Sequence, residues 1–82
     1  MKVTLDPVKR KTWEIQRYIL GEMKIKNVTQ KDIADELGIT QPAVSYLLSD
    51  ITSVSVPQLL VIFDLLQTPQ EERGRLITLN DK

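Results

Sequence analysis

The chain has 82 residues, enough for one small domain and too few for two separate hydrophobic cores. Hydrophobic residues make up 41% and charged residues 27%, a balance typical of a folded globular protein rather than a disordered one. Cysteine and histidine are both absent, which removes disulfides, the usual zinc and haem ligands, and Ser-His or Cys-His catalysis. We therefore expect no catalytic residue, no metal site and no cofactor.

The net charge is zero, but the charges are unevenly distributed along the sequence. Residues 1–31 contain eight basic and three acidic side chains, a balance of +5, and residues 32–82 contain three basic and eight acidic ones, a balance of −5. A typical nucleic-acid-binding domain is more basic overall, which counts against that function here. The longest apolar run, Leu59–Phe63, is far too short to cross a membrane, and no apolar secretory segment follows Lys2, so we expect a cytoplasmic protein.

The first helix is predicted over residues 7–26. Asp6 is a favoured N-cap residue, and Pro7 is tolerated at the first helical position, where its missing N–H does no harm. Apolar residues then recur at helical spacing, and we expect Trp13 to lie in the core. Asn27 is a plausible end of the helix because asparagine tolerates a left-handed backbone.

Two short helices follow, over 30–37 and 41–48. Thr29, with an aspartate three residues later, resembles a capping box that opens the first of them. Gly38 follows its last periodic residue, as a helix-ending glycine should. Thr40 is the expected cap of the second, and a proline in the first turn is compatible with a helix.

The remaining elements are predicted to be a turn over 49–55 and two further helices, over 56–66 and 69–79. Phe63 is expected in the core of the first, and Thr68 is the expected cap of the second, because proline and glutamate follow at the first and third positions. These elements predict an all-α fold, a compact bundle of about five short helices.

The second and third predicted helices have the pattern of a helix-turn-helix. Two helices that cross steeply need a small residue where their backbones meet and a turn residue that is free to take a positive φ. Ala34 and Gly38 supply these. The apolar inner face is predicted to consist of Ile33, Leu37, Ile39, Val44 and Leu47.

The outer face of the third predicted helix is polar and uncharged. Its residues share one face because they lie three and four positions apart. They are Gln41, Ser45, Tyr46 and Ser49. Glutamine can form a bidentate pair with adenine, serine can bond to a base or a phosphate, and an aromatic ring can contact a thymine methyl group. The first turn of the second helix offers backbone N–H groups to a phosphate.

From Gln30 to Leu66 the sequence resembles the DNA-binding domain of the lambda repressor and Cro superfamily, the XRE-type regulators. The resemblance implies one helix-turn-helix domain over residues 1–82. In this family, the glutamine that opens the second helix contacts phosphate and braces a second glutamine, and Gln30 and Gln41 stand at those positions. The DNA-binding residues that the resemblance implies are Thr29, Gln30, Lys31, Thr40, Gln41, Pro42, Ala43, Ser45, Tyr46, Ser49, Thr52 and Ser55.

Three positions depart from the family pattern. Pro42 stands where a base-reading polar residue is common, which removes one expected contact. Ser49-Asp50 replaces the usual Asn-Gly at the end of the recognition helix, and a carboxylate close to phosphates is unfavourable unless it points away. The basic residues of the first helix fit either a solvated face or a flank of the DNA backbone, and both possibilities stay open.

The implied function is a sequence-specific transcriptional regulator, a phage- or bacterial-type repressor that acts by occupying its operator. A homodimer would place two recognition helices about 34 Å apart on pseudo-palindromic double-stranded DNA. Leu76, Ile77 and Leu79 are the candidate dimer contacts, although they could instead cover the monomer core. The alternative is a protein-interaction module on the same fold, such as an antitoxin, an anti-repressor or a modulator of a partner regulator, which the zero net charge and uncharged recognition helix would support.

Overall fold

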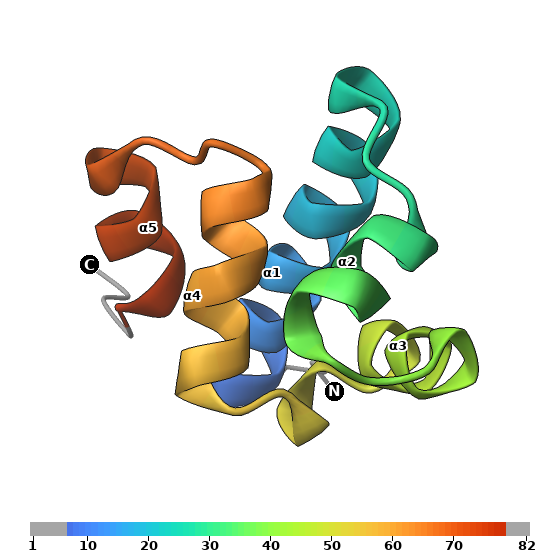
Figure 1. Cartoon of the computed structure of the whole chain (residues 1–82). Helices are drawn as coiled ribbons and strands as arrows, with labels where there is room; N and C mark the ends of the chain where they lie inside the picture. The colour runs from blue at the N-terminus through green and yellow to red at the C-terminus, as the bar shows by residue number, and fades with distance from the viewer. Residues whose placement is uncertain (1–6, 79–82) are drawn as a thin grey trace.

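The computed structural model describes residues 7–78, which contain five α-helices and one 3₁₀ turn and no strand, as expected for an all-α fold (Figure 1). In chain order these elements are α1 (Pro7–Lys26), α2 (Gln30–Leu37), α3 (Gln41–Ser49), η1 (Ile51–Ser53), α4 (Val56–Leu65) and α5 (Gln70–Ile77). The bounds of α1 and α2 coincide with the predicted ranges, α3 is one residue longer, and α4 is one residue shorter. Asp6 and Leu79 lie outside the described residues.

Three of the helices begin with a side-chain cap. The Asp32 N–H donates to the Thr29 hydroxyl at 3.1 Å, and the Thr29 N–H donates to the Asp32 carboxylate at 2.9 Å, which completes the capping box of α2. Thr40 and Ser55 cap α3 and α4 in the same way through their hydroxyl oxygens. These bonds satisfy first-turn N–H groups that no helix can satisfy internally, and they fix where each helix starts.

Residues with a left-handed backbone end the first two helices. Asn27 has φ of 62° and Gly38 has φ of 71°, as their residue types indicate. The Ile39 N–H then donates to the Ala34 carbonyl at 3.0 Å, which closes the turn between α2 and α3. Gln67 also has a positive φ, of 55°, although glutamine carries no sequence signal for that conformation.

The core is formed by side chains from all five helices and from η1. Phe63 is fully buried, as predicted, and the Tyr18 ring meets it edge-on with centroids 6.4 Å apart. The buried hydrophobic residues are Ile15, Ile19, Ile33, Ala34, Val44, Leu48, Ile51, Ile62, Phe63, Leu66 and Leu76.

The predicted core position of Trp13 is wrong, because its side chain is 51% exposed. Ile15 and Ile19 define the buried side of α1. Trp13 precedes Ile15 by two residues, which places it about 200° away around the helix and therefore on the solvent side.

The start of α5 also differs from the prediction. Thr68 does not cap this helix: it is 3% exposed, and its hydroxyl accepts a hydrogen bond of 3.1 Å from the Tyr18 hydroxyl. Pro69 takes the N-cap position without a side-chain bond, and α5 begins at Gln70. The predicted turn over 49–55 contains η1, because Ile51 is drawn into the core.

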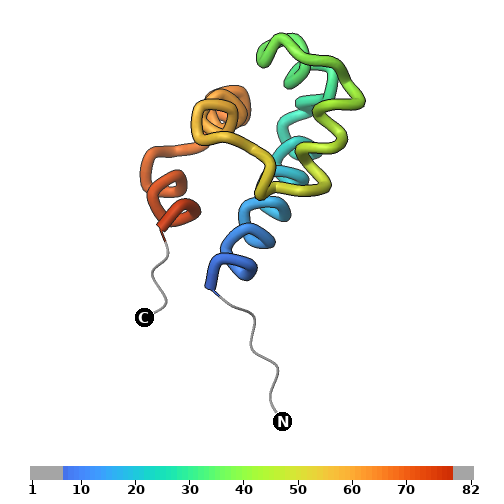
Figure 2. Tube along the Cα trace, turned by 90° about the horizontal axis from the view of Figure 1, so that it is seen from below, coloured from blue at the N-terminus to red at the C-terminus, as the bar shows by residue number. Residues whose placement is uncertain are grey.

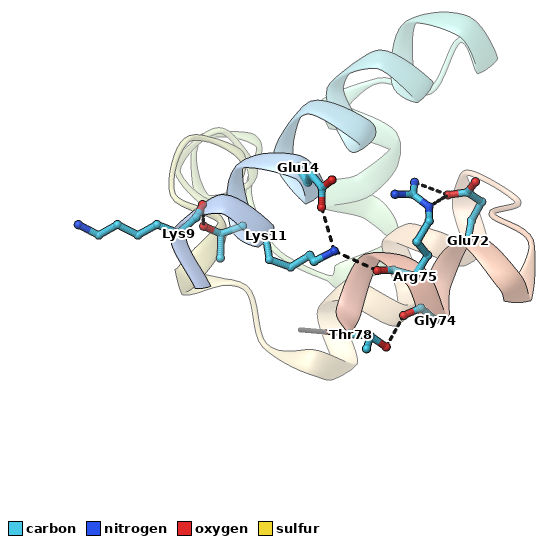
Figure 3. Close-up of polar contacts among 8 residues, drawn as sticks. Lys9, Lys11, Glu14, Glu72, Gly74, Arg75 and Thr78 are labelled. Carbon is cyan, nitrogen blue, oxygen red and sulfur yellow. Dashed lines mark hydrogen bonds and ion pairs between the residues drawn. The ribbon is translucent and has the colours of Figure 1, made fainter. Parts of the chain in front are cut away.

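Basic side chains of α1 join it to the C-terminal ends of other helices. The Lys11 ammonium lies 2.9 Å from Glu14 and donates to the Arg75 carbonyl at 3.2 Å (Figure 3). The Lys26 ammonium donates to the Leu66 carbonyl at 2.8 Å. Cations are favoured at helix C-termini because carbonyl groups there lack intrahelical partners. In Figure 2 the N-terminal half of α1 lies beneath η1, with α5 on one side and α3 on the other.

Candidate nucleic-acid interface

The turn between α2 and α3 holds the two helices at a close crossing. Ala34 is 4% exposed, which fits its predicted role as the small residue at the crossing. The inner face of α3 differs in one position from the prediction: Val44 and Leu48 are buried, whereas Leu47 is only half-buried. The four-residue spacing from Val44 places Leu48 almost directly below it, so Leu48 and not Leu47 completes this face.

The outer face of α3 is open to solvent. Five residues along it are exposed, among them Tyr46 at 59%. The exposed residues are Gln41, Pro42, Ser45, Tyr46 and Ser49. Ala43 is half-buried and lies at the edge of this face. None of these side chains is charged, so the face offers hydrogen-bond donors, acceptors and one aromatic ring.

Local hydrogen bonds hold the C-terminal end of this face. The Ser49 hydroxyl donates to the Tyr46 carbonyl at 2.9 Å, and the Ser53 hydroxyl lies 3.4 Å from the Tyr46 hydroxyl. The Tyr46 side chain is thereby directed toward η1. Its ring nevertheless stays accessible, because more than half of its surface is open.

Asp50 follows α3 and bonds to its own loop. Its carboxylate accepts from the Thr52 hydroxyl at 2.5 Å and from the Ser53 hydroxyl at 3.1 Å, and these bonds lower the pKa of Asp50. The Thr52 hydroxyl proton is committed to this carboxylate, so Thr52 is a poorer donor to phosphate than its sequence position implies. The hydroxyls of Thr40 and Ser55 accept backbone bonds as caps and keep a proton to donate.

The N-terminal end of α2 combines favourable and unfavourable features for an anion. Thr29, Gln30 and Lys31 are exposed there, and the first-turn N–H groups carry the positive end of the helix dipole. However, the Lys31 ammonium lies 3.1 Å from the Asp35 carboxylate. The hydrogen bonds from Thr29 lower the pKa of Asp32, so a negative charge persists at this helix end.

A hollow of about 250 Å³ separates the end of α3 from the first turns of α1. The Gln16 side chain bridges the two elements by donating to the Leu48 carbonyl at 2.7 Å. Trp13 lines this hollow, and the Arg17 guanidinium lies 4.8 Å from the centroid of its ring. The sequence predicts Trp13 in the core and leaves the basic residues of α1, Arg17 among them, open between a solvated face and a flank of the DNA backbone; the four-residue spacing of Trp13 and Arg17 is the signal that could have paired them. The residues that line the hollow are Lys9, Thr12, Trp13, Gln16, Ser49, Asp50, Ile51 and Thr52.

The sequence profile of the helix-turn-helix family, of lambda repressor-like type, matches residues 22–71, which include α2, α3, η1 and α4. The chain belongs to the helix-turn-helix family. The matched segment spans more than half of the chain and contains the whole outer face of α3. No curated protein and no solved structure matches the chain.

Membership of the helix-turn-helix family makes the protein a DNA-binding regulator in broad terms. The resemblance inferred from Gln30 to Leu66 is thereby confirmed. Among residues 7–78, no helix is long and apolar enough to cross a membrane.

Proposed function

We propose that this helix-turn-helix protein is a sequence-specific transcriptional regulator of phage or bacterial type, which acts in the cytoplasm and represses by occupying its operator. The 82 residues form a single domain in this proposal. The observation that carries it is the contrast across α3: Val44 and Leu48 anchor one side in the core, while Gln41, Ser45 and Tyr46 on the other side are exposed. A helix held in this way can enter the major groove without unfolding.

Base recognition is assigned to the outer face of α3. Gln41 forms a bidentate pair with an adenine, because its amide offers one donor and one acceptor at the required spacing. Ser45 bonds to a neighbouring base edge, and the Tyr46 ring and Ala43 methyl group contact thymine methyl groups. Pro42 contributes apolar contact alone, since its side chain has no donor or acceptor.

Phosphate contacts are assigned to both ends of the motif. Thr29, Gln30 and Lys31 approach one stretch of backbone from the start of α2, and Thr40 donates its hydroxyl proton beside them. Ser55 donates its hydroxyl proton to the other stretch, from the segment after α3, and Ser49 and Thr52 join it when their hydroxyls exchange their bonds to the Tyr46 carbonyl and the Asp50 carboxylate for a phosphate. The negative charges of Asp32 and Asp50 oppose these contacts, so the motif alone supplies little net attraction to DNA.

A homodimer would allow two copies of α3 to bind successive major grooves about 34 Å apart. Of the three candidate contacts in and after α5, Leu76 is 1% exposed and belongs to the monomer core. Ile77 is 52% exposed and keeps its place in the proposed dimer contact. Leu79 lies outside the described residues.

A protein-interaction module on the same fold is the second candidate. It is favoured by the absence of charge on the outer face of α3 and by the pairing of Lys31 with Asp35, which leaves this surface without a strong phosphate anchor. A partner regulator would then cover the face that DNA covers in the first proposal.

Selection of binding sites from a random double-stranded DNA library distinguishes the two functions. Purified protein should enrich a pseudo-palindrome whose half-sites are spaced by about 10 base pairs. Enrichment of no sequence, at a salt concentration low enough for backbone contacts to form, would contradict the DNA-binding proposal and favour the protein partner.

A further inference from the structure

The solvent side of α1 carries a row of basic, aromatic and apolar side chains, which we call the α1 stripe. Its members lie three or four residues apart, so they share one face. All five are exposed, and no acidic residue occurs among them. The α1 stripe consists of Arg10, Trp13, Arg17, Leu20 and Lys24.

Two cations of the α1 stripe differ from Lys11 and Lys26 in what they contact. Lys11 and Lys26 are engaged with helix carbonyls and with glutamates of α1. Arg17 and Lys24 form no ion pair within residues 7–78, and Arg17 stacks on the Trp13 ring instead. The α1 stripe therefore presents positive charge that the outer face of α3 lacks.

The Trp13 end of the α1 stripe adjoins the segment that follows α3. Trp13, Ser49 and Thr52 line the same hollow, and the Gln16 bond to Leu48 fixes the distance between α1 and the last turn of α3. In Figure 2 the N-terminal half of α1 runs alongside η1. A DNA backbone that passes Ser49 and Thr52 would next meet the rim of this hollow.

We infer that Trp13 and Arg17 form a sequence-independent contact with the DNA backbone beside the half-site read by α3, an inference that rests on the proposed function. Arg17 donates to a phosphate in the bidentate manner of a guanidinium. The Trp13 ring holds the guanidinium in place by cation–π attraction and packs against the adjoining sugar. This contact supplies positive charge that the uncharged outer face of α3 lacks, and it offsets the repulsion between Asp50 and the phosphates.

The chain contains a built-in probe of this contact, because Trp13 is its only tryptophan. Titration with the selected operator duplex should shift the fluorescence emission of Trp13 and reduce its quenching by acrylamide. Arg17→Gln should weaken binding to all duplexes alike and reduce the slope of log K against log salt by about 0.9. Lys24→Gln is the matched control: it removes one charge from the same face about 16 Å along α1 from Trp13 and should leave the slope unchanged.

The outcomes separate this inference from the proposed function. If the wild type binds its operator and Gln41→Ala weakens binding, but Trp13 stays open to acrylamide and Arg17→Gln keeps the wild-type slope, the backbone contact is wrong and the proposed function stands. If the wild type selects no duplex, both fail. If vesicles containing phosphatidylserine protect Trp13 while operator DNA does not, the α1 stripe is a membrane-binding surface and the inference is overturned.

Discussion

Gly38 determines whether α2 can turn into α3. Its φ of 71° is unfavourable for a residue with a Cβ atom and worst for a β-branched one. Beyond Gly38 and its two chain neighbours, no atom lies within 4 Å of a Cβ added at this position, so the cost of a substitution comes from the backbone and not from a clash.

Gly38→Val should therefore lower the free energy of unfolding by at least about 1–2 kcal/mol. Gly38→Asn, which adds a side chain of similar size that tolerates this conformation, should lose clearly less. Urea unfolding of the two variants measures the difference. Equal stabilities for both variants would mean that the turn does not depend on a left-handed residue.

Single residues could be predicted from the sequence where one local backbone requirement decides their role. Gly38 and Thr29 are examples, because a positive φ and a helix cap each select a narrow set of residue types. Trp13 and Thr68 could not be placed in this way. The side of α1 that is buried depends on α3 and α5, and the inward position of Thr68 depends on a tyrosine 50 positions away.

The capping box of α2 makes the stability of this element depend on pH. Hydrogen bonds from the Thr29 N–H and hydroxyl lower the pKa of Asp32 from its ordinary value of 3.8. A carboxylate whose pKa is lowered by folding stabilises the protein above its ordinary pKa, and this contribution is lost as pH falls through the folded value.

The melting temperature should thus fall as the pH is lowered from 5 to about 3, and part of that fall should disappear in Asp32→Ala. The pKa values of Asp50 and Glu14 are also lowered, so these two residues account for the fall in melting temperature that remains in Asp32→Ala. Thermal melts followed by circular dichroism across this range are the test. A constant gap between the two proteins at every pH would contradict the role given to the Asp32 charge.

A hydrogen bond between Tyr18 and Thr68 connects α1 to the segment between α4 and α5. Tyr18→Phe should lower the free energy of unfolding by about 0.5–1.5 kcal/mol, because the buried Thr68 hydroxyl loses its donor. Tyr46→Phe is the matched control and should change little, since Tyr46 is exposed. Chemical unfolding measures both variants. If both lost the same free energy of unfolding, the hydrogen bond between Tyr18 and Thr68 would not contribute to stability.

Most elements with strong end signals could be predicted from the sequence; α5 is an exception, because Thr68 bonds to Tyr18 in the core instead of capping the helix. The ends of α2 are marked by Thr29 and Gly38 and were expected at their observed positions. The turn η1 has no such mark, because it forms only when the core takes in Ile51.

Folding brings basic side chains from the first half of the sequence against helices from the acidic second half. Lys11 and Lys26 of the basic half contact the C-terminal ends of α5 and α4 in the acidic half. On the α1 stripe, the Arg17 charge lies over Trp13, which lines the hollow beside the end of α3. The sequence gives the number of charges but not their positions in space, so a net charge of zero does not say where positive charge is exposed.

The assembly on DNA is expected to contain two chains. Sedimentation of the protein with a duplex carrying one complete selected site should give a complex that includes about twice the 9.4 kDa of a single chain. Ile77→Asp should weaken this assembly and leave the monomer folded, because Ile77 is half-exposed. A complex with one chain per complete site would refute the homodimer.

The central claim is that the outer face of α3 reads base edges, and Gln41 tests it most directly. We predict that Gln41→Ala lowers affinity for the selected operator by about 1–3 kcal/mol and removes the preference at one base position of each half-site, with unrelated duplexes bound as before. The matched control is Gln70→Ala, which truncates an exposed glutamine at the first position of α5 and should change nothing. Competition binding against operators altered one base pair at a time measures both effects. Unchanged affinity and unchanged base preference in Gln41→Ala would contradict the claim.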